Sequence, residues 1–151
     1  MAAVQATQDT WRVFGASVTG KAHLDNNIPC QDAHAHAQVN GVLVAIVCDG
    51  AGSARLSEQG AQFVAAQTVQ ALAGRLEQGA TVQDLLDGAL ADTLAQIRAA
   101  LDDIARAASA TLDDYASTVV GVVMGADAGF FFHLGDGLGV AQLLDGGELI
   151  S

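Results

Sequence analysis

The feature that most constrains the fold is an uninterrupted apolar run from Val42 to Cys48. Asn40-Gly41 comes just before it, and this pair of residues favours a two-residue hairpin turn. Residues 33–39, before the turn, alternate between small apolar and polar side chains, as in a strand with one buried face. A short run without polar residues is typical of a strand covered on both faces. We therefore predict a β-hairpin whose second strand, residues 42–48, lies inside the fold.

The other predicted strands are short β-rich runs separated by turns that contain glycine. Residues 19–31, with their Gly, Asn and Pro residues, predict a loop before the hairpin. The remaining strands span residues 11–18, 115–124, 129–134, 138–144 and 148–150, with turns at residues 127–129, 135–137 and 145–147.

The spacing of apolar residues becomes helical between the two groups of strands. Ser57 is a candidate N-cap for a first helix that ends before Gly79. Thr81 and Asp84 have the spacing of a weak capping box, which begins a second helix reaching about residue 108. Strands followed by two helices and then strands, without βαβ alternation, predict an α+β fold in which a helical pair covers one face of an antiparallel sheet.

The composition fits one folded domain and excludes several classes of partner. The chain has 151 residues, of which 51% are hydrophobic and 15% are charged, so an intrinsically disordered chain is excluded. It has 6 Lys and Arg residues against 17 Asp and Glu residues, and the net charge of -11 offers no attraction to nucleic acid or an anionic membrane. We expect residues 1–10 to be an N-terminal tail and residues 11–151 to form a single domain.

The sequence also predicts a cytoplasmic location. The first residues have neither the basic nor the apolar region of a signal peptide. The longest apolar stretch, Val119 to Leu134, is too short and too often broken by Gly and Asp to span a bilayer. The two cysteines, Cys30 and Cys48, exclude a disulfide scaffold and a Cys-rich zinc site, and they suit a reducing compartment.

Three aspartates beside strands or glycine-containing turns are the main candidates for chemistry. Asp49 follows the central apolar run and precedes Gly50, so its carboxylate is rigidly placed where a ligand can approach the backbone closely. Asp32 lies just before a strand, and Asp136 lies in a Gly-Asp-Gly turn. Carboxylate and carbonyl oxygens are the ligands that Mg²⁺ and Mn²⁺ prefer. Each aspartate is also an ordinary turn or capping residue when considered alone, so both interpretations remain open.

The histidines and possible nucleophiles leave further alternatives. His23 lies in a polar loop, where it could contact an anionic substrate, protonate a leaving group, or be solvated without a role. His34 and His36 share one face of a predicted strand, a spacing that can bind metal but is more typical of a polar sheet face. No covalent nucleophile is evident, because Cys48 lies in the buried strand and Ser53 is not in a G-x-S-x-G motif.

Several short segments, taken together and in order, carry a resemblance to a known protein family. They are Phe14–Ser17, Gly20–His23, Pro29–Ala33, Val47–Ser53, Ala116–Thr118 and Leu134–Gly137. The chain resembles the metal-dependent (type 2C, or PPM) serine/threonine protein phosphatases, most of all a bacterial branch with a G-x-x-H and a PCQDA segment. The resemblance extends over nearly the whole chain, and motifs in the right order are more specific than any single one.

This resemblance implies two stacked antiparallel β-sheets, a β-sandwich, flanked by helical pairs. It also implies a binuclear Mn²⁺ or Mg²⁺ centre at one end of the sandwich, with an additional, weaker metal site. In such a hydrolase a metal-activated water attacks phosphorus in line, so the expected substrate is a phosphoprotein with phosphoserine or phosphothreonine esters. No covalent phosphoenzyme is needed, which agrees with the lack of an evident nucleophile.

The resemblance assigns roles to individual residues. Asp49 corresponds to the carboxylate that bridges the metals, and Gly50 supplies a backbone carbonyl. Asp32 corresponds to the acidic residue that helps position a metal-bound water, so Asp32 and Asp49 are expected to be catalytic as well as metal-binding. Asp136 corresponds to a ligand of the additional metal. Gln31 stands where many members have Glu.

Two departures from the family pattern leave a second function open. Many members hold the phosphate with an Arg before the first acidic motif, whereas here Lys21 and His23 are the candidates for substrate binding, with His23 also a candidate for catalysis. The family normally continues with strands and helices that bear two more metal-binding aspartates, and this sequence ends at Ser151. We therefore expect a domain that is incomplete at its C-terminus, with an exposed sheet edge available for self-association.

These observations leave three hypotheses. The leading one is a metal-dependent phosphoprotein phosphatase, favoured by the joint presence of Asp32, Asp49 and Asp136. The alternative is a catalytically inactive pseudophosphatase or regulatory binding module of the same fold, favoured by Gln31 and by the missing aspartates. A third is an acidic α+β domain whose Asp-Gly turns form no site.

Overall fold

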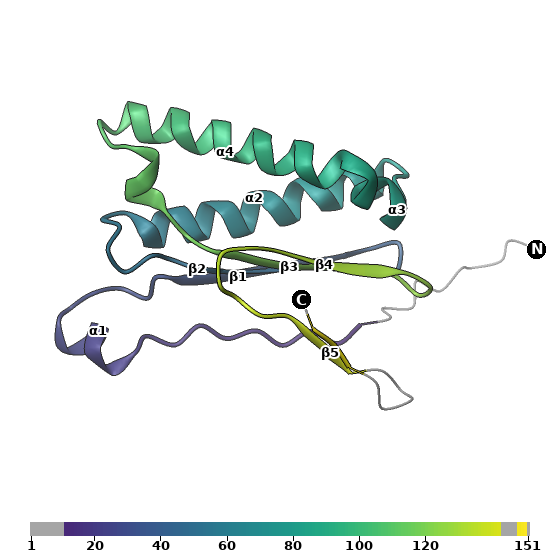
Figure 1. The fold of residues 1–151 in the computed structure, drawn as a ribbon, viewed down its shortest axis with the longest axis horizontal. Helices are drawn as coiled ribbons and strands as arrows, with labels where there is room; N and C mark the ends of the chain where they lie inside the picture. The colour runs from purple at the N-terminus through teal and green to yellow at the C-terminus, as the bar shows by residue number, and fades with distance from the viewer. Residues whose placement is uncertain (1–10, 143–147, 151) are drawn as a thin grey trace, which may run out of the picture.

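The predicted hairpin forms part of a four-stranded antiparallel sheet in the computed structural model, which describes residues 11–142 and 148–150 (Figure 1). Strand β1 (Asp32–Val39) pairs with β2 (Val42–Asp49) through the turn at Asn40-Gly41. Both turn residues have positive φ, 51° and 80°, as a type I′ turn requires. The hairpin turn predicted from the sequence is therefore confirmed.

The sheet has the order β1-β2-β3-β4, with β3 (Val119–Met124) and β4 (Gly129–Leu134) added as a second hairpin. The strand predicted over residues 115–124 begins only at Val119, because a 3₁₀ helix, η2 (Leu112–Tyr115), precedes it. Strands β5 (Val140–Gln142) and β6 (Glu148–Ile150) form a separate two-stranded sheet. The predicted turn at residues 145–147 and the end of the strand predicted over 138–144 lie outside the described residues.

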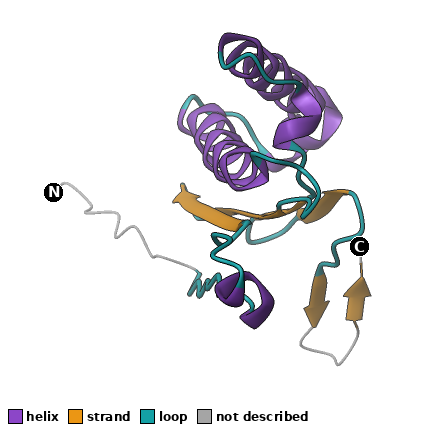
Figure 2. Ribbon diagram, turned by 90° about the vertical axis from the view of Figure 1, so that its left-hand side faces the viewer, coloured by secondary structure: helices purple, strands orange, loops and turns teal. Residues whose placement is uncertain are grey.

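One helical pair covers one face of this sheet (Figure 2). Helix α2 (Ser57–Glu77) packs directly on β1 and β2, and α4 (Leu90–Ala107) packs on α2. The capping box at Thr81 and Asp84 is confirmed, and it begins α3 (Val82–Asp84). An α+β fold with a helical pair on one face of an antiparallel sheet is therefore confirmed. No helix in the described ranges is long and apolar enough to cross a membrane.

Two details of the helical layer differ from the predictions. The second helix is interrupted by a π-helical turn, η1 (Leu85–Ala89), where Gly88 has φ of +151°, a value that Gly tolerates and other residues rarely adopt. Ser57 is not the N-cap of α2, because that position belongs to Leu56. The Ser57 hydroxyl instead accepts a hydrogen bond from the Gln31 side chain.

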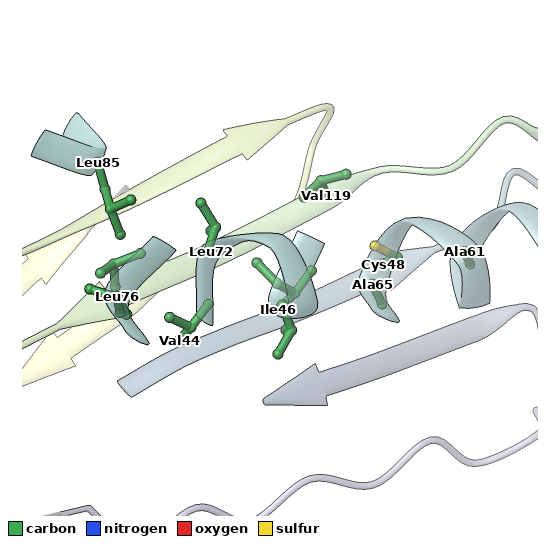
Figure 3. Close-up of a cluster of buried hydrophobic side chains, with 11 residues drawn as sticks. Val44, Ile46, Cys48, Ala61, Ala65, Leu72, Leu76, Leu85 and Val119 are labelled. Carbon is green, nitrogen blue, oxygen red and sulfur yellow. The ribbon is translucent and has the colours of Figure 1, made fainter. Parts of the chain in front are cut away.

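The core lies between the sheet and α2 (Figure 3). Val44, Ile46 and Cys48 on β2 point to the helical side and are almost completely buried against residues such as Leu72 and Leu76. The alternate residues of β2 point to the other face, where Val47 is 54% exposed. The prediction that both faces of this strand are covered is therefore wrong for the described residues.

That second face is crossed by residues 11–20, which are extended but form no strand, so the strand predicted over 11–18 is wrong. Trp11 binds through its backbone to the Gln38 side chain, and its indole donates to the carbonyl of Gly41. Gly15 lies directly against the imidazole of His34. Because these contacts use side chains instead of a backbone ladder, the segment lies over the sheet without extending it (Figure 1).

A short helix, α1 (Lys21–Asp25), follows within the loop predicted over residues 19–31. Together, residues 11–20, α1 and β5 lie on the side of the four-stranded sheet opposite to the helical pair (Figures 1 and 2). The described residues form a four-stranded sheet and a separate two-stranded sheet, β5-β6, and the stacking of two sheets implied by the family resemblance stays a prediction.

Two glycines of α2 provide a matched test of this packing. A Cβ atom on Gly60 would lie 2.0 Å from the carbonyl oxygen of Tyr115, whereas a Cβ atom on Gly74 would meet nothing within 4 Å. We expect Gly60→Ala to destabilise the protein by about 1–3 kcal/mol through overpacking. Gly74→Ala should stabilise it by about 0.5–1 kcal/mol, because alanine favours the helix. Thermal and urea unfolding of both variants measure these changes, and equal effects would contradict the packing described.

Candidate active site

Asp32 and Asp49 lie directly opposite each other where β1 begins and β2 ends. Residues that face each other in an antiparallel ladder project their side chains to the same side of the sheet. The buried positions of β2 point to α2, so both aspartates project to the face without helices, where both are exposed. The hairpin register alone therefore brings these two carboxylates together.

Backbone contacts from the segment before β3 hold the end of β2 in place. The backbone N–H of Asp49 donates to Oγ1 of Thr118 at 3.1 Å, and the N–H of Thr118 donates to the carbonyl of Asp49 at 2.8 Å. The next residues continue this pairing, because Gly50 forms an isolated bridge with Ser117 and Ala51 donates to the carbonyl of Ala116. Thr118 and Ser117 thus both contact the backbone of this turn.

Gly50 is surrounded too closely for a side chain. A Cβ atom there would lie 2.7 Å from the carbonyl oxygen of Gln31 and 3.0 Å from backbone and side-chain atoms of Ser57. The Gly50 N–H donates to that Gln31 carbonyl, and the Gln31 side chain donates to the Ser57 hydroxyl at 2.8 Å. The amide of Gln31 thus binds the first residue of α2.

Asp136 reaches the same region from the opposite edge of the sheet, after β4. It lies in the predicted turn between β4 and β5, where Gly135 has φ of +104° and packs against Thr118. A hollow in the surface is lined by Asp49, Thr118, Val120 and Asp136, among others. The structure therefore brings the three aspartates predicted from the sequence to one end of the sheet.

The electrostatics of this cluster act on Asp49. Partial desolvation at the strand end raises the pKa of the Asp49 carboxyl above its ordinary value, and the charge of Asp32 raises this pKa further. A hydrogen bond with the Asp32 carboxyl and the charge of Asp136 act in the same direction. Like charges this close oppose ionisation, so a cation that binds between them relieves their repulsion.

A second hollow beside the aspartates has a lining that was not predicted. It includes Phe14, Ser17 and His34 together with Asp32 and Asp49. Period-two alternation along β1 could have identified His34, which shares a face with Asp32. Ser17 and Phe14 carried no such signal, because an irregular segment brings them across the sheet.

The two residues predicted to bind substrate, Lys21 and His23, both lie in α1, where Lys21 is exposed and His23 is half-buried. Neither is among the described residues that line the two hollows beside Asp49. Their role in substrate binding stays a prediction.

The donor set at the aspartates fits a hard divalent cation. Asp32 and Asp49 offer carboxylate oxygens from facing positions of the hairpin, and the next residue, Gly50, has a backbone carbonyl. Desolvation, and after it the charge of Asp32, raises the pKa of the Asp49 carboxyl, and a cation would offset the second of these effects. Mg²⁺ is commonly held by one or two carboxylates and keeps several waters. Within residues 11–142 and 148–150, however, no group of three or more His, Cys, Asp or Glu residues is arranged to hold a metal ion.

Comparison with known proteins identifies the family. A sequence model of the protein phosphatase 2C family matches residues 19–149. The chain belongs to the protein phosphatase 2C family.

Within this family, the serine/threonine-protein phosphatase 3 of Escherichia coli (strain K12) is 28% identical to the chain over 146 residues. The match covers 93% of this chain and 56% of the E. coli protein, so the chain spans little more than half the length of that relative. No solved structure matches the chain significantly. The phosphatase 2C family is generally metal-dependent, in agreement with the oxygen-rich donor set.

The raised pKa of the Asp49 carboxyl leads to a prediction about the stability of the protein. A carboxyl whose pKa is raised by folding contributes stability below its unfolded pKa and loses it as the pH rises through its folded pKa. At pH 7 we therefore expect Asp49→Asn to raise Tm in the absence of metal, and Mg²⁺ or Mn²⁺ to raise the Tm of the wild-type protein more than that of the variant. Asp127→Asn, in the exposed turn before β4, is the control. It should change neither the Tm without metal nor the rise in Tm that the metal causes. Thermal unfolding with EDTA and with added metal measures both effects, and a lower Tm for metal-free Asp49→Asn would contradict them.

Proposed function

We propose that this chain is a phosphoprotein phosphatase domain that hydrolyses phosphoserine and phosphothreonine esters with a metal-activated water at a binuclear Mn²⁺ or Mg²⁺ site. The observation that carries the proposal is the pair of facing carboxylates, Asp32 and Asp49, in a chain of the phosphatase 2C family. The name of the E. coli relative, a serine/threonine-protein phosphatase, supports the same substrate class.

In this proposal Asp49, Asp32 and the carbonyl of Gly50 hold two cations, and Asp136 contributes to an additional, weaker site. When bound, the cations supply an acidified water as nucleophile and offset negative charge on the phosphoryl oxygens. Asp32 would accept a hydrogen bond from the attacking water and so orient it. His23 protonates the leaving oxygen, and Lys21 attracts the phosphate into an otherwise acidic region.

A second candidate function is a catalytically inactive binding module of the same fold. It is favoured by the lack of a three-residue metal-binding cluster within the described ranges. It is favoured also by Gln31, whose amide binds Ser57 and adds no negative charge beside Asp32. In that case the domain would recognise a phosphoprotein without hydrolysing it.

Calorimetric titration with Mn²⁺, combined with p-nitrophenyl phosphate hydrolysis in the same samples, tests the enzyme. We expect saturable Mn²⁺ binding and metal-dependent turnover that falls at least about 100-fold in Asp49→Asn, because the loss of a metal-binding charge removes electrostatic stabilisation of the transition state. Asp127→Asn should retain full activity. Mn²⁺ binding without turnover would support the binding module, and turnover that EDTA and Asp49→Asn leave unchanged would refute the proposed site.

We also propose that the chain associates with itself and is located in the cytoplasm. The four-stranded sheet has β1 and β4 as its edges, and an exposed edge presents unpaired backbone groups to another chain. Cys30 and Cys48 are both free thiols, in agreement with a reducing compartment.

We expect the chain to associate as its concentration rises, because pairing between edge strands satisfies these backbone groups. A lysine that replaces Leu134, a 56%-exposed residue of β4, should weaken the association without a large loss of stability. Analytical ultracentrifugation of the wild-type chain and of Leu134→Lys over a range of concentrations measures this. A monomer throughout the range would contradict edge pairing.

A further inference from the structure

An apolar cavity of about 320 Å³ lies on the helical side of the sheet, between α2, α4 and the segment that leads into β3. Val64 of α2, Ile97 and Leu101 of α4, and Val119 of β3 contribute to its lining. Cavities that bind small molecules have volumes of about 300–1,000 Å³, with mostly apolar linings and few polar groups. This cavity has the size and the lining of such a site.

Arg98 is the one charged residue among those that line the cavity. It is exposed and, in the part of the chain that the structure describes, it forms no ion pair or hydrogen bond. The neighbouring cation on α4 differs, because Arg106 pairs with Asp102 and Asp103. In a chain with a net charge of -11, an unpaired guanidinium at an apolar cavity provides charge complementarity for an anion.

We propose that this cavity binds a small molecule that combines an apolar body with one anionic group, such as a medium-chain or aryl carboxylate. The apolar body displaces water from the lining, and the anion pairs with Arg98. The proposal does not depend on the phosphatase function, because binding can be measured without turnover.

The cavity also adjoins the segment that pairs with the turn after Asp49. Ala116 and Ser117 line it, and the backbones of these two residues pair with Ala51 and Gly50 on their other side. A bound molecule therefore contacts the same segment that holds the end of β2. This contact gives binding a local signature in the backbone amides of Ala116 and Ser117.

Octanoate is a suitable probe, and its binding can be followed by NMR of the ¹⁵N-labelled chain. We expect saturable shifts of the amides of Leu101, Ala116 and Ser117. The indole N–H of Trp11, which donates to Gly41 on the opposite side of the sheet, should not shift. Shifts that fail to saturate, or that are as large at Trp11 as at the cavity, would overturn the proposal.

Two pairs of variants separate the charge from the cavity. Arg98→Gln should weaken octanoate binding by up to about fivefold, the range of an exposed ion pair, and leave the binding of 1-octanol unchanged. Arg106→Gln is the matched control on the same helix and should bind octanoate as the wild-type protein does. Octylamine, which has the opposite charge, should bind more weakly than octanoate; equal affinities for the two would exclude the role of Arg98.

Ala95 lines the cavity and is exposed, so a larger side chain can replace it without overpacking the core. Ala95→Leu should reduce octanoate binding at least about threefold by filling part of the cavity, whereas Ala99→Leu, one turn further along α4 and outside the lining, should not. Octanoate affinity that Ala95→Leu leaves unchanged would place binding elsewhere and overturn the proposal.

Discussion

The close approach of α2 to the end of β2, at Gly50, is the constraint on which the rest of the site depends. No side chain fits between Gly50, the carbonyl of Gln31 and the first turn of α2. This contact brings together the start of β1, the end of β2 and the beginning of α2. Ser117 and Thr118 complete the arrangement by pairing with the same turn. The backbone around Asp49 is therefore held on several sides, while its carboxylate stays exposed.

Burial on one face of β2 allows charges to gather on the other. Full burial of a Val, Leu or Ile side chain contributes about 1.5–3 kcal/mol, and Val44, Ile46 and Leu72 are all buried between sheet and helix. The repulsion between two exposed charges about 4 Å apart in water is only about 1 kcal/mol. The helical side therefore stabilises the hairpin by more than the facing aspartates destabilise it. A site made of like charges is compatible with the fold because it lies where solvent screens it.

Local patterns predicted most of the sheet and both long helices. Asn40-Gly41 fixed the turn, and the turn fixed the register that pairs Asp32 with Asp49. The errors came where tertiary contacts decide the structure. The β-forming residues around Trp11 predicted a strand, but the backbone N–H and carbonyl of Trp11 bind the Gln38 side chain, and the segment joins no sheet. The apolar residues on both sides of Gly88 keep a helical spacing, so the sequence pattern gave no sign of an interruption. The backbone dihedral angles of Gly88 show that the helix is interrupted there.

The aspartates of the site could be predicted because strand ends and glycine turns mark them in the sequence. Phe14, Ser17 and the lining around Arg98 could not, since each reaches its place through packing between segments that share no local pattern. Fold class followed from the order of the elements alone. The detailed surroundings of the carboxylates required the positions of residues from five separate parts of the chain.

Gln31 shows how stability and metal affinity are balanced at this site. Its neutral amide donates to Ser57 and so helps to hold the start of α2 against the β-hairpin. A glutamate in its place could not donate this hydrogen bond, and it would add a third negative charge beside Asp32 and Asp49. That charge would strengthen the attraction for a divalent cation, because affinity rises with the number of charged ligands. The residue that is present favours the packed helix over the additional charge, so in the proposed metal site the affinity for a cation would depend on Asp32 and Asp49.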